Sequence, residues 1–331
     1  MSSGTARRLI RRIGKALLGL VIVLLALAIL GAIYQSIATA LAERAYPPPG
    51  EMVDVGGYSL HINCVGQGSP TVVLDAGMGL FSAQWVRVQE EVSGTTRVCA
   101  YDRAGMGWSE MGPEPRDAKQ ITSELHTLLS KAGIEGPYVL VGHSLGGLSM
   151  LTYANRYPDQ VAGVVLVDSS IDTYQFSQRP EAQDQRSAVV PPLVRFGLSL
   201  PARLGIVRLL SMLAPASPEL PQKQRAQTDA LTPSTRQFTT SVLEFLAPTQ
   251  TRRLGSLGNK PLAVVTAGES EPSWLKRQDK LATLTSSNSI HRVVKGATHE
   301  SLLYDKRDAQ ATSAAIVEVV AAVRNDRPLA H

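Results

Sequence analysis

The sequence predicts an α/β protein with a mainly parallel sheet and helices on both faces, preceded by one transmembrane helix. Three observations support this. Short aliphatic segments alternate with segments of helical spacing from residue 52 onward. A long uncharged stretch comes first, and a glycine-rich turn joins one aliphatic segment directly to a helix. Strands that alternate with helices are typical of parallel sheets, because each crossover between parallel strands needs a helix.

The N-terminal segment has the pattern of a membrane anchor. Five basic residues fall within residues 1–15, and residues 16–42 carry no charge. A helix of that length reaches roughly 40 Å, which exceeds a hydrocarbon core of about 30 Å. The basic cluster predicts a cytoplasmic tail over 1–15, a single span over 16–42 and an extracytoplasmic domain at the cell membrane. The alternative is a cleaved signal peptide and a secreted protein.

The basic cluster also explains the net charge. The chain carries +5 at pH 7, and subtracting the five basic residues of the tail leaves about zero for the rest. No basic patch with interleaved aromatic residues follows, so we expect the lipid bilayer as a partner and no nucleic acid.

Proline and glycine positions predict the domain boundaries. Residues 43–51 contain Pro47-Pro48-Pro49-Gly50, an extended linker. Residues 52–170 form the first part of the core and 261–331 the second. Between them, 171–260 contains nine prolines and short apolar runs, which indicates an inserted helical cap.

The core segments follow the expected alternation. The aliphatic run 161–167 is typical of a strand buried on both faces. The expected strands are 58–65, 71–74, 97–101, 138–141, 161–167, 261–267 and 290–294, and the clearest helices are 118–132, 145–156 and 309–323.

The chemistry is concentrated in Gly142-His143-Ser144-Leu145-Gly146, which matches G-x-S-x-G between a strand and a helix. A sharp strand-to-helix turn exposes the serine hydroxyl at a helix N-terminus, where negative charge is stabilised. Side chains at Gly142 and Gly146 would clash across this turn. Ser144 is therefore the predicted nucleophile.

These features resemble the α/β-hydrolase superfamily from about Met52 to Val323. Leu74–Gly79 is similar to the family's oxyanion-hole loop, although the common His-Gly is Ala76-Gly77 here. Asp102–Ser109 resembles its D-R-x-G-x-G-x-S turn, and Gly296–His299 resembles its histidine loop. The resemblance implies an eight-stranded, mostly parallel sheet and a catalytic His299.

The acid of the triad is left open among three carboxylates. Gly268-Glu269-Ser270-Glu271-Pro272 resembles the family's G-x-x-D-P stretch, which favours Glu271. Asp168, at the end of the previous strand, and Glu269 are the alternatives.

The resemblance implies a serine hydrolase that cleaves an ester or related acyl bond of a small hydrophobic substrate. The oxyanion would be bound by the backbone N–H groups of Met78 and Leu145. No metal or organic cofactor is expected, since no metal-ligand motif or phosphate-binding loop is present. Acyl transfer or perhydrolysis at the same site, or a non-catalytic binding module, are the alternatives.

The sequence has two cysteines, Cys64 and Cys99. If the resemblance holds, their strands are neighbours and the pair forms a disulfide, as an exported domain permits. Two reduced core thiols are the alternative.

Overall fold

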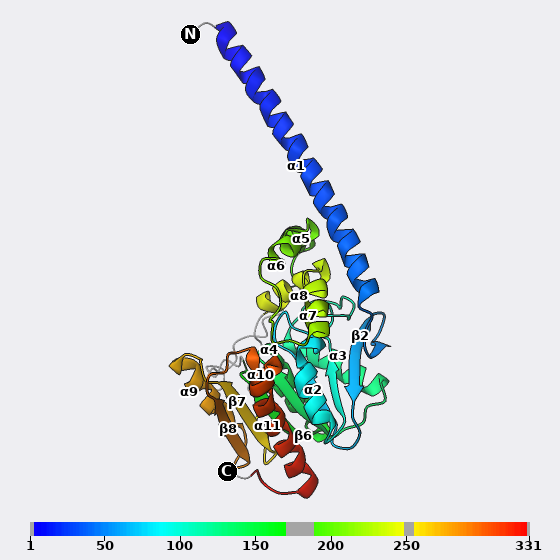
Figure 1. Cartoon of the computed structure of the whole chain (residues 1–331), viewed down its shortest axis with the longest axis vertical. Coiled ribbons are helices and arrows are strands. Elements are labelled where there is room, and N and C mark those ends of the chain that lie inside the picture. The colour runs from blue at the N-terminus through cyan, green and yellow to red at the C-terminus, as the bar shows by residue number, and fades with distance from the viewer. Residues whose placement is uncertain (1–2, 170–188, 248–254, 330–331) are drawn as a thin grey trace.

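The sheet has eight strands and is covered by helices on both faces (Figure 1). This computed structural model describes residues 3–169, 189–247 and 255–329, with side chains from Ile10 onward. The strands are β1 (Glu51–Asp54), β2 (Ser59–Val65), β3 (Val72–Asp75), β4 (Val98–Tyr101), β5 (Tyr138–His143), β6 (Val161–Val167), β7 (Leu262–Ala267) and β8 (Ser289–Val294).

The strands lie in the order β1-β2-β4-β3-β5-β6-β7-β8. The β1–β2 and β2–β4 pairs are antiparallel, and the other pairs are parallel. The predicted architecture is therefore confirmed. Strand β1 was not expected, because its short, largely exposed sequence Glu-Met-Val-Asp has no buried face.

Alternate residues of the central strands enter two separate cores. Val139 and Val141 pack on one face with α2 and α11, whereas Leu140 packs on the other with α3, α4 and α9. Both faces are covered, which explains the continuous aliphatic runs. The helices that pack on the sheet are α2 (Val86–Ser93), α3 (Ala118–Lys131), α4 (Leu145–Arg156), α9 (Pro272–Leu281), α10 (Ser301–Tyr304) and α11 (Lys306–Asn325).

The cap is a group of helices between β6 and β7, at the sheet edge where the parallel strands end (Figure 1). Its described helices are α5 (Pro192–Arg203), α6 (Ile206–Ser211), α7 (Gln222–Leu231) and α8 (Thr235–Leu246). The expected start of the insert, Ile171, lies outside the described residues.

Helix α1 (Ser3–Ala45) is longer than the expected span of 16–42. It includes Arg11 and Arg12 at one end, and it continues through Glu43–Ala45, which were expected in the linker. Residues Ile10–Ala45 form one helix that is long and apolar enough to cross a membrane. Its N-terminal half extends away from the domain, and its C-terminal half passes along the cap (Figure 1).

The two cysteines are joined as expected. Cys64 in β2 lies directly opposite Cys99 in β4 across the antiparallel pair, and a disulfide links them. The bond closes a loop across 35 residues of sequence that contains β3 and α2.

We predict that Cys64→Ala/Cys99→Ala lowers the free energy of unfolding by about 2–4 kcal/mol, because the open chain gains loop entropy. Urea unfolding of the full chain in detergent measures the effect. Wild-type protein unfolded under reducing conditions should match the double variant, and superimposable curves for oxidised wild type and the variant would contradict the prediction.

Candidate active site

Ser144 occupies a strained turn between β5 and α4. Its φ is 51° and its ψ is −121°, a backbone conformation that residues other than glycine rarely adopt. A Cβ at Gly142 would collide with the backbone of Gly146 and Gly147, and one at Gly146 would collide with the carbonyl groups of Asp75 and Ala76. The expected clash across the turn is therefore found at Gly142, whereas Gly146 is required by the close approach of the end of β3 and its following loop.

The loop after β3 lies directly against this turn. A Cβ at Gly77 would come within 3.1 Å of the Ser144 Cβ and 2.8 Å of the His143 Nδ1 atom. Leu145 is the first residue of α4, where the N–H has no intrahelical acceptor. The two predicted oxyanion donors, Met78 and Leu145, thus belong to the two segments that meet at Ser144.

His299 is bound to Asp168 at the same edge of the sheet. The His299 Nδ1 atom lies 2.5 Å from the Asp168 Oδ2 atom, and the carboxylate is almost completely buried while the imidazole is partly exposed. Asp168 follows Val167, which pairs with His143 across β5 and β6. Ser144 and Asp168 therefore leave adjacent strands at the same level.

Asp168 is held by three donors. Its Oδ1 atom accepts hydrogen bonds from the Ala267 backbone N–H at 3.2 Å and from the Trp274 indole N–H at 2.8 Å, and its Oδ2 atom faces His299. These bonds fix the carboxylate and thereby orient the imidazole.

The expected pairing of His299 with Glu271 is wrong. Glu271 is exposed and caps α9, where its backbone carbonyl accepts from the Trp274 N–H at 2.8 Å. Glu269 is exposed as well and touches the histidine loop only through its backbone N–H, which donates to the Ala297 carbonyl. The loop after β7 leaves both glutamates exposed, the following helix α9 supplies Trp274 to the site, and the carboxylate is that of Asp168 at the end of β6.

His143 holds the histidine loop, Gly296–His299, through a hydrogen bond. Its Nε2 atom lies 2.9 Å from the backbone oxygen of His299, and because a carbonyl only accepts, Nε2 carries the proton. The two rings lie 4.5 Å apart. Burial, reinforced by the nearby His299, lowers the pKa of His143 to about 3, so the ring is neutral near pH 7.

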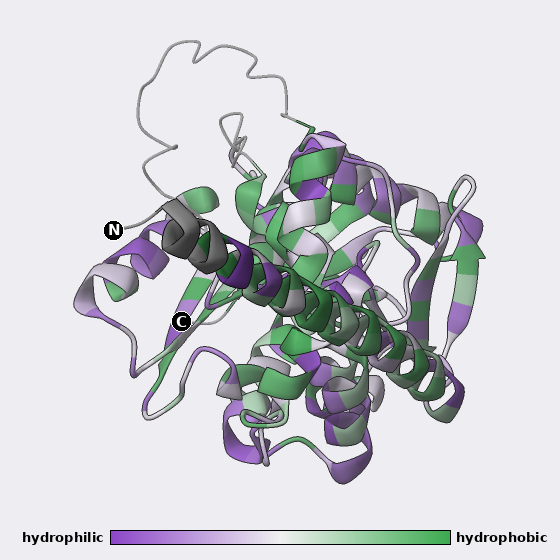
Figure 2. Cartoon of the chain, turned by 90° about the horizontal axis from the view of Figure 1, so that it is seen from above, coloured by the Kyte–Doolittle hydropathy of each residue, from purple (hydrophilic) through white to green (hydrophobic). Residues whose placement is uncertain are grey.

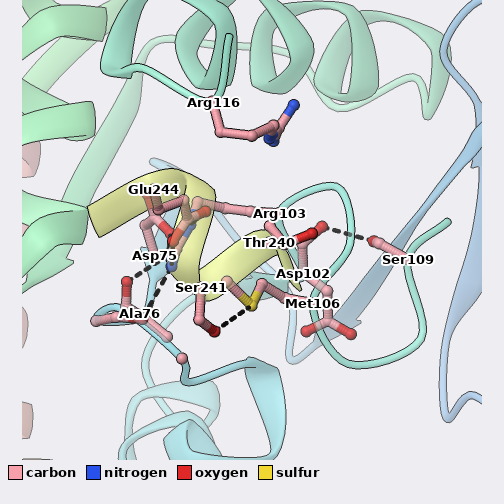
Figure 3. Close-up of polar contacts among 12 residues, drawn as sticks. Asp75, Ala76, Asp102, Arg103, Met106, Ser109, Arg116, Thr240, Ser241 and Glu244 are labelled. Atoms are coloured by element: carbon pink, nitrogen blue, oxygen red, sulfur yellow. Dashed lines mark hydrogen bonds and ion pairs between the residues drawn. The ribbon is translucent and has the colours of Figure 1, made fainter. Parts of the chain in front are cut away.

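A buried Arg103 joins the loop after β3, the predicted oxyanion loop, to the cap (Figure 3). It donates to the Asp75 carboxylate and to the carbonyl oxygens of Ala76 and Gly77 at 2.5–2.9 Å. Its Nε and Nη2 atoms also bind the two oxygens of Glu244 in α8, at 2.9 and 3.0 Å. These contacts use all five guanidinium N–H groups.

The Arg103 contacts determine where the Gly77–Met78 peptide points. In a trans peptide the carbonyl and the N–H lie on opposite sides. Because the Gly77 oxygen faces Arg103, the N–H of Met78 faces away from it. Gln237 of α8 adds a second tie, since its Nε2 atom donates to the Gly79 oxygen at 2.9 Å.

A second histidine–aspartate pair has no access to solvent. The His61 Nδ1 atom lies 2.9 Å from the Asp102 Oδ2 atom, and both side chains are fully buried. Burial alone would raise the pKa of Asp102, but the adjacent His61 ring, together with hydrogen bonds from the backbone N–H groups of Ser82 and Trp108, brings it below the usual range. This pair supports the Asp102–Ser109 turn.

Three side chains of the site were not expected from the sequence. They are those of Trp274, Glu244 and His143. Their roles depend on contacts between segments that are distant in sequence, up to 156 residues apart for His143 and His299. In the described ranges, no group of three or more His, Cys, Asp or Glu side chains is arranged to hold a metal ion.

Known proteins resemble this chain in sequence and in fold. The sequence model of the α/β hydrolase family matches residues 72–315 of this chain. An uncharacterised vacuolar membrane protein of Saccharomyces cerevisiae is 30% identical over 130 residues, which cover 34% of this chain and 20% of the yeast protein. The chain spans between 17% and 46% of the lengths of the curated relatives that it first matches.

Solved structures agree over most of the chain. An enol-lactonase from Burkholderia xenovorans has a TM-score of 0.60 at 20% identity, covering 82% of this chain and 100% of that one. A thermophilic esterase from Thermogutta terrifontis has a TM-score of 0.58 at 19% identity, covering 82% and 98%. At this level of identity the likeness shows the fold.

The depressed pKa of His143 predicts an acid-sensitive fold. An unfolded histidine binds its proton near pH 6.5, whereas His143 in the folded chain does so only near pH 3. Stability should therefore fall as the pH drops below 6.5, by at most about 1.4 kcal/mol per pH unit.

The test compares urea unfolding of wild type and His143→Gln from pH 8 to pH 4.5. The glutamine amide can still donate to the His299 carbonyl but does not titrate, so the variant should lose less stability toward low pH. The pH 8 values provide the reference for the substitution itself, and parallel curves would contradict the prediction.

Proposed function

Because the chain belongs to the α/β hydrolase family, we propose that it is a serine hydrolase that cleaves a carboxylic ester, or a related acyl bond, of a hydrophobic substrate. The observation that carries this proposal is the His299–Asp168 pair beside the strained Ser144 turn. Binding alone would not require a serine, an imidazole and a buried carboxylate at one edge of the sheet.

The proposed reaction follows from which nitrogen of His299 is occupied. Nδ1 is bound to Asp168, so Nε2 is the atom that accepts the Ser144 proton. The Ser144 oxygen bonds to the acyl carbon, the bond to the leaving oxygen breaks, and His299 protonates that oxygen to release an alcohol. Water then attacks the acyl-enzyme by the same proton transfers and releases the acid.

The proposed oxyanion donors are the N–H groups of Met78 and Leu145. The Arg103 contacts with the Ala76 and Gly77 carbonyls support this assignment, because they turn the Met78 N–H away from Arg103. The N-terminus of α4 adds its dipole at the same place. Each such donor contributes on the order of 10²–10³ to the rate.

We further propose that α1 is retained as a single-pass anchor with its N-terminus in the cytoplasm. The basic residues before the apolar stretch support this orientation. Contacts between the C-terminal half of α1 and the cap support retention, because cleavage near Ala42 would remove part of a packed interface: Gln35 in α1 is almost completely buried and donates to the Pro233 oxygen at 2.9 Å. The yeast relative described as a vacuolar membrane protein is consistent with a membrane location.

The activity test uses the full chain in detergent with p-nitrophenyl esters of increasing acyl length. Wild type should hydrolyse them and Ser144→Ala and His299→Ala should not. Asp168→Asn should lower kcat on the order of 10³–10⁴-fold, because the imidazole loses its orienting partner. Glu271→Gln is the matched control and should keep kcat near the wild-type value.

Labelling with a fluorophosphonate separates hydrolysis from simple binding. An adduct on Ser144 of the folded wild type is expected. Absence of the adduct, together with no wild-type turnover above the Ser144→Ala background, would overturn the proposal in favour of a binding module.

Arg103→Lys tests the positioning of the oxyanion loop. Lysine keeps the positive charge beside Asp75 and Glu244, but its three donors cannot replace five. We expect kcat to fall about 10- to 100-fold. A boronic acid that mimics the tetrahedral intermediate should bind correspondingly more weakly, while KM changes little.

The matched control for Arg103→Lys is Arg116→Lys, whose buried ion pair with Glu124 lies outside the loop contacts. An unchanged boronic acid affinity in Arg103→Lys, with the fold intact by circular dichroism, would contradict the role.

A further inference from the structure

The cap carries an unusual concentration of exposed apolar side chains on α5, α6 and their flanks. Leu193 and Leu213 are more than 80% exposed, and no element of the described chain covers them. We name this set the cap apolar surface. Its members are Val189, Leu193, Val194, Phe196, Leu200, Ile206, Leu209, Leu210, Met212 and Leu213.

The sequence that forms the cap apolar surface is basic, although Arg195 in it is paired with Glu114. Residues 189–218 contain Arg195, Arg203 and Arg208 and no acidic residue. The Arg203 guanidinium lies 5.2 Å from the centre of the Phe196 ring. An apolar surface with the exposed Arg203 guanidinium at its edge fits the boundary between acyl chains and lipid headgroups.

Helix α1 lies directly beside this surface. A Cβ at Gly31 would collide with the Leu204 carbonyl, and one at Gly205 would come within 3.0 Å of the Tyr34 ring. Backbone therefore meets backbone closely where α1 crosses the α5–α6 connection. Figure 1 shows the exposed half of α1 extending beyond this crossing, and Figure 2 shows that half as largely hydrophobic.

The crossing can be placed at a depth in the bilayer. A core of about 30 Å accommodates about 20 helical residues, so a span that begins after Lys15 ends near Gln35. The polar contacts agree with this boundary, because Arg208 donates to the Gln35 Oε1 atom at 3.0 Å and approaches Thr39. Gly31 lies four residues before Gln35, or about 6 Å deeper.

We propose that the cap apolar surface is a second membrane-contacting element, with the apolar side chains of α5 and α6 seated in the outer leaflet beside α1. This inference rests on the proposed anchor. The occupant is lipid because the surface is continuous with the exposed apolar face of α1 and lies at the depth of the acyl chains. A consequence is that the cap of the proposed hydrolase faces substrates dissolved in the bilayer.

The test measures depth with single-cysteine labels on the full chain in phosphatidylcholine–phosphatidylglycerol vesicles. An environment-sensitive fluorophore is attached by maleimide at Leu193→Cys or Leu213→Cys, while the native cysteines stay protected in their disulfide. Both labels should emit at short wavelength, be quenched by doxyl groups on lipid acyl chains and be shielded from iodide.

Two further labels separate the possible failures. Leu24→Cys, in the exposed half of α1, reports whether the anchor is in the bilayer, and Val293→Cys, on β8 away from the cap, is the matched exposed aqueous control. Loss of doxyl quenching at Leu24 would overturn the anchor and the inference together. Quenching at Leu24 with iodide-accessible labels at Leu193 and Leu213 would overturn the inference alone. Labels shielded from both quenchers would indicate a second copy of the chain and overturn it as well.

Discussion

The buried guanidinium of Arg103 is the interaction on which the site depends. Its five N–H groups are all used, by two carboxylates and two backbone carbonyls from β3, its following loop and the cap. Burial raises the pKa of Asp75, and the adjacent arginine opposes that rise. A buried ion of either sign that loses its partner is strongly destabilising, so the loop after β3 and Glu244 of α8 are held together in one arrangement.

The contacts of the cap extend this arrangement from the candidate site to helix α1. Gln237 and Glu244 connect α8 to the loop that contains Met78, and α8 packs against α5 within the cap. The cap in turn holds α1 through Arg208 and Gln35, and the indole N–H of Trp108 donates to the Tyr46 oxygen just after α1 ends. A continuous series of packed and hydrogen-bonded contacts therefore links α1 to the candidate site.

The sequence predicted the parts of the site that depend on local constraints. Gly142 is required by a tight turn, and the cysteine pairing follows once neighbouring strands are assigned. The acid could not be chosen locally, because Glu271 has the right sequence context and Asp168 has the right position in space. The choice depends on how the loop after β7 turns away and on Trp274 reaching back. The Arg103–Glu244 pair joins residues 141 apart and has no local signal.

Backbone strain gives an independent reason to regard Asp168 as part of the site. In the described residues, Ser144, Asp168 and Asp326 are the non-glycine residues with positive φ. Asp326 ends α11, an ordinary position for a left-handed residue. Ser144 and Asp168 instead directly follow His143 and Val167, which are paired across β5 and β6. The end of a strand does not by itself require a non-glycine residue with positive φ. Such conformations persist only when surrounding contacts hold them. Asp168 is held by β7, by α9 and by His299, so the strain lies where serine, imidazole and carboxylate meet.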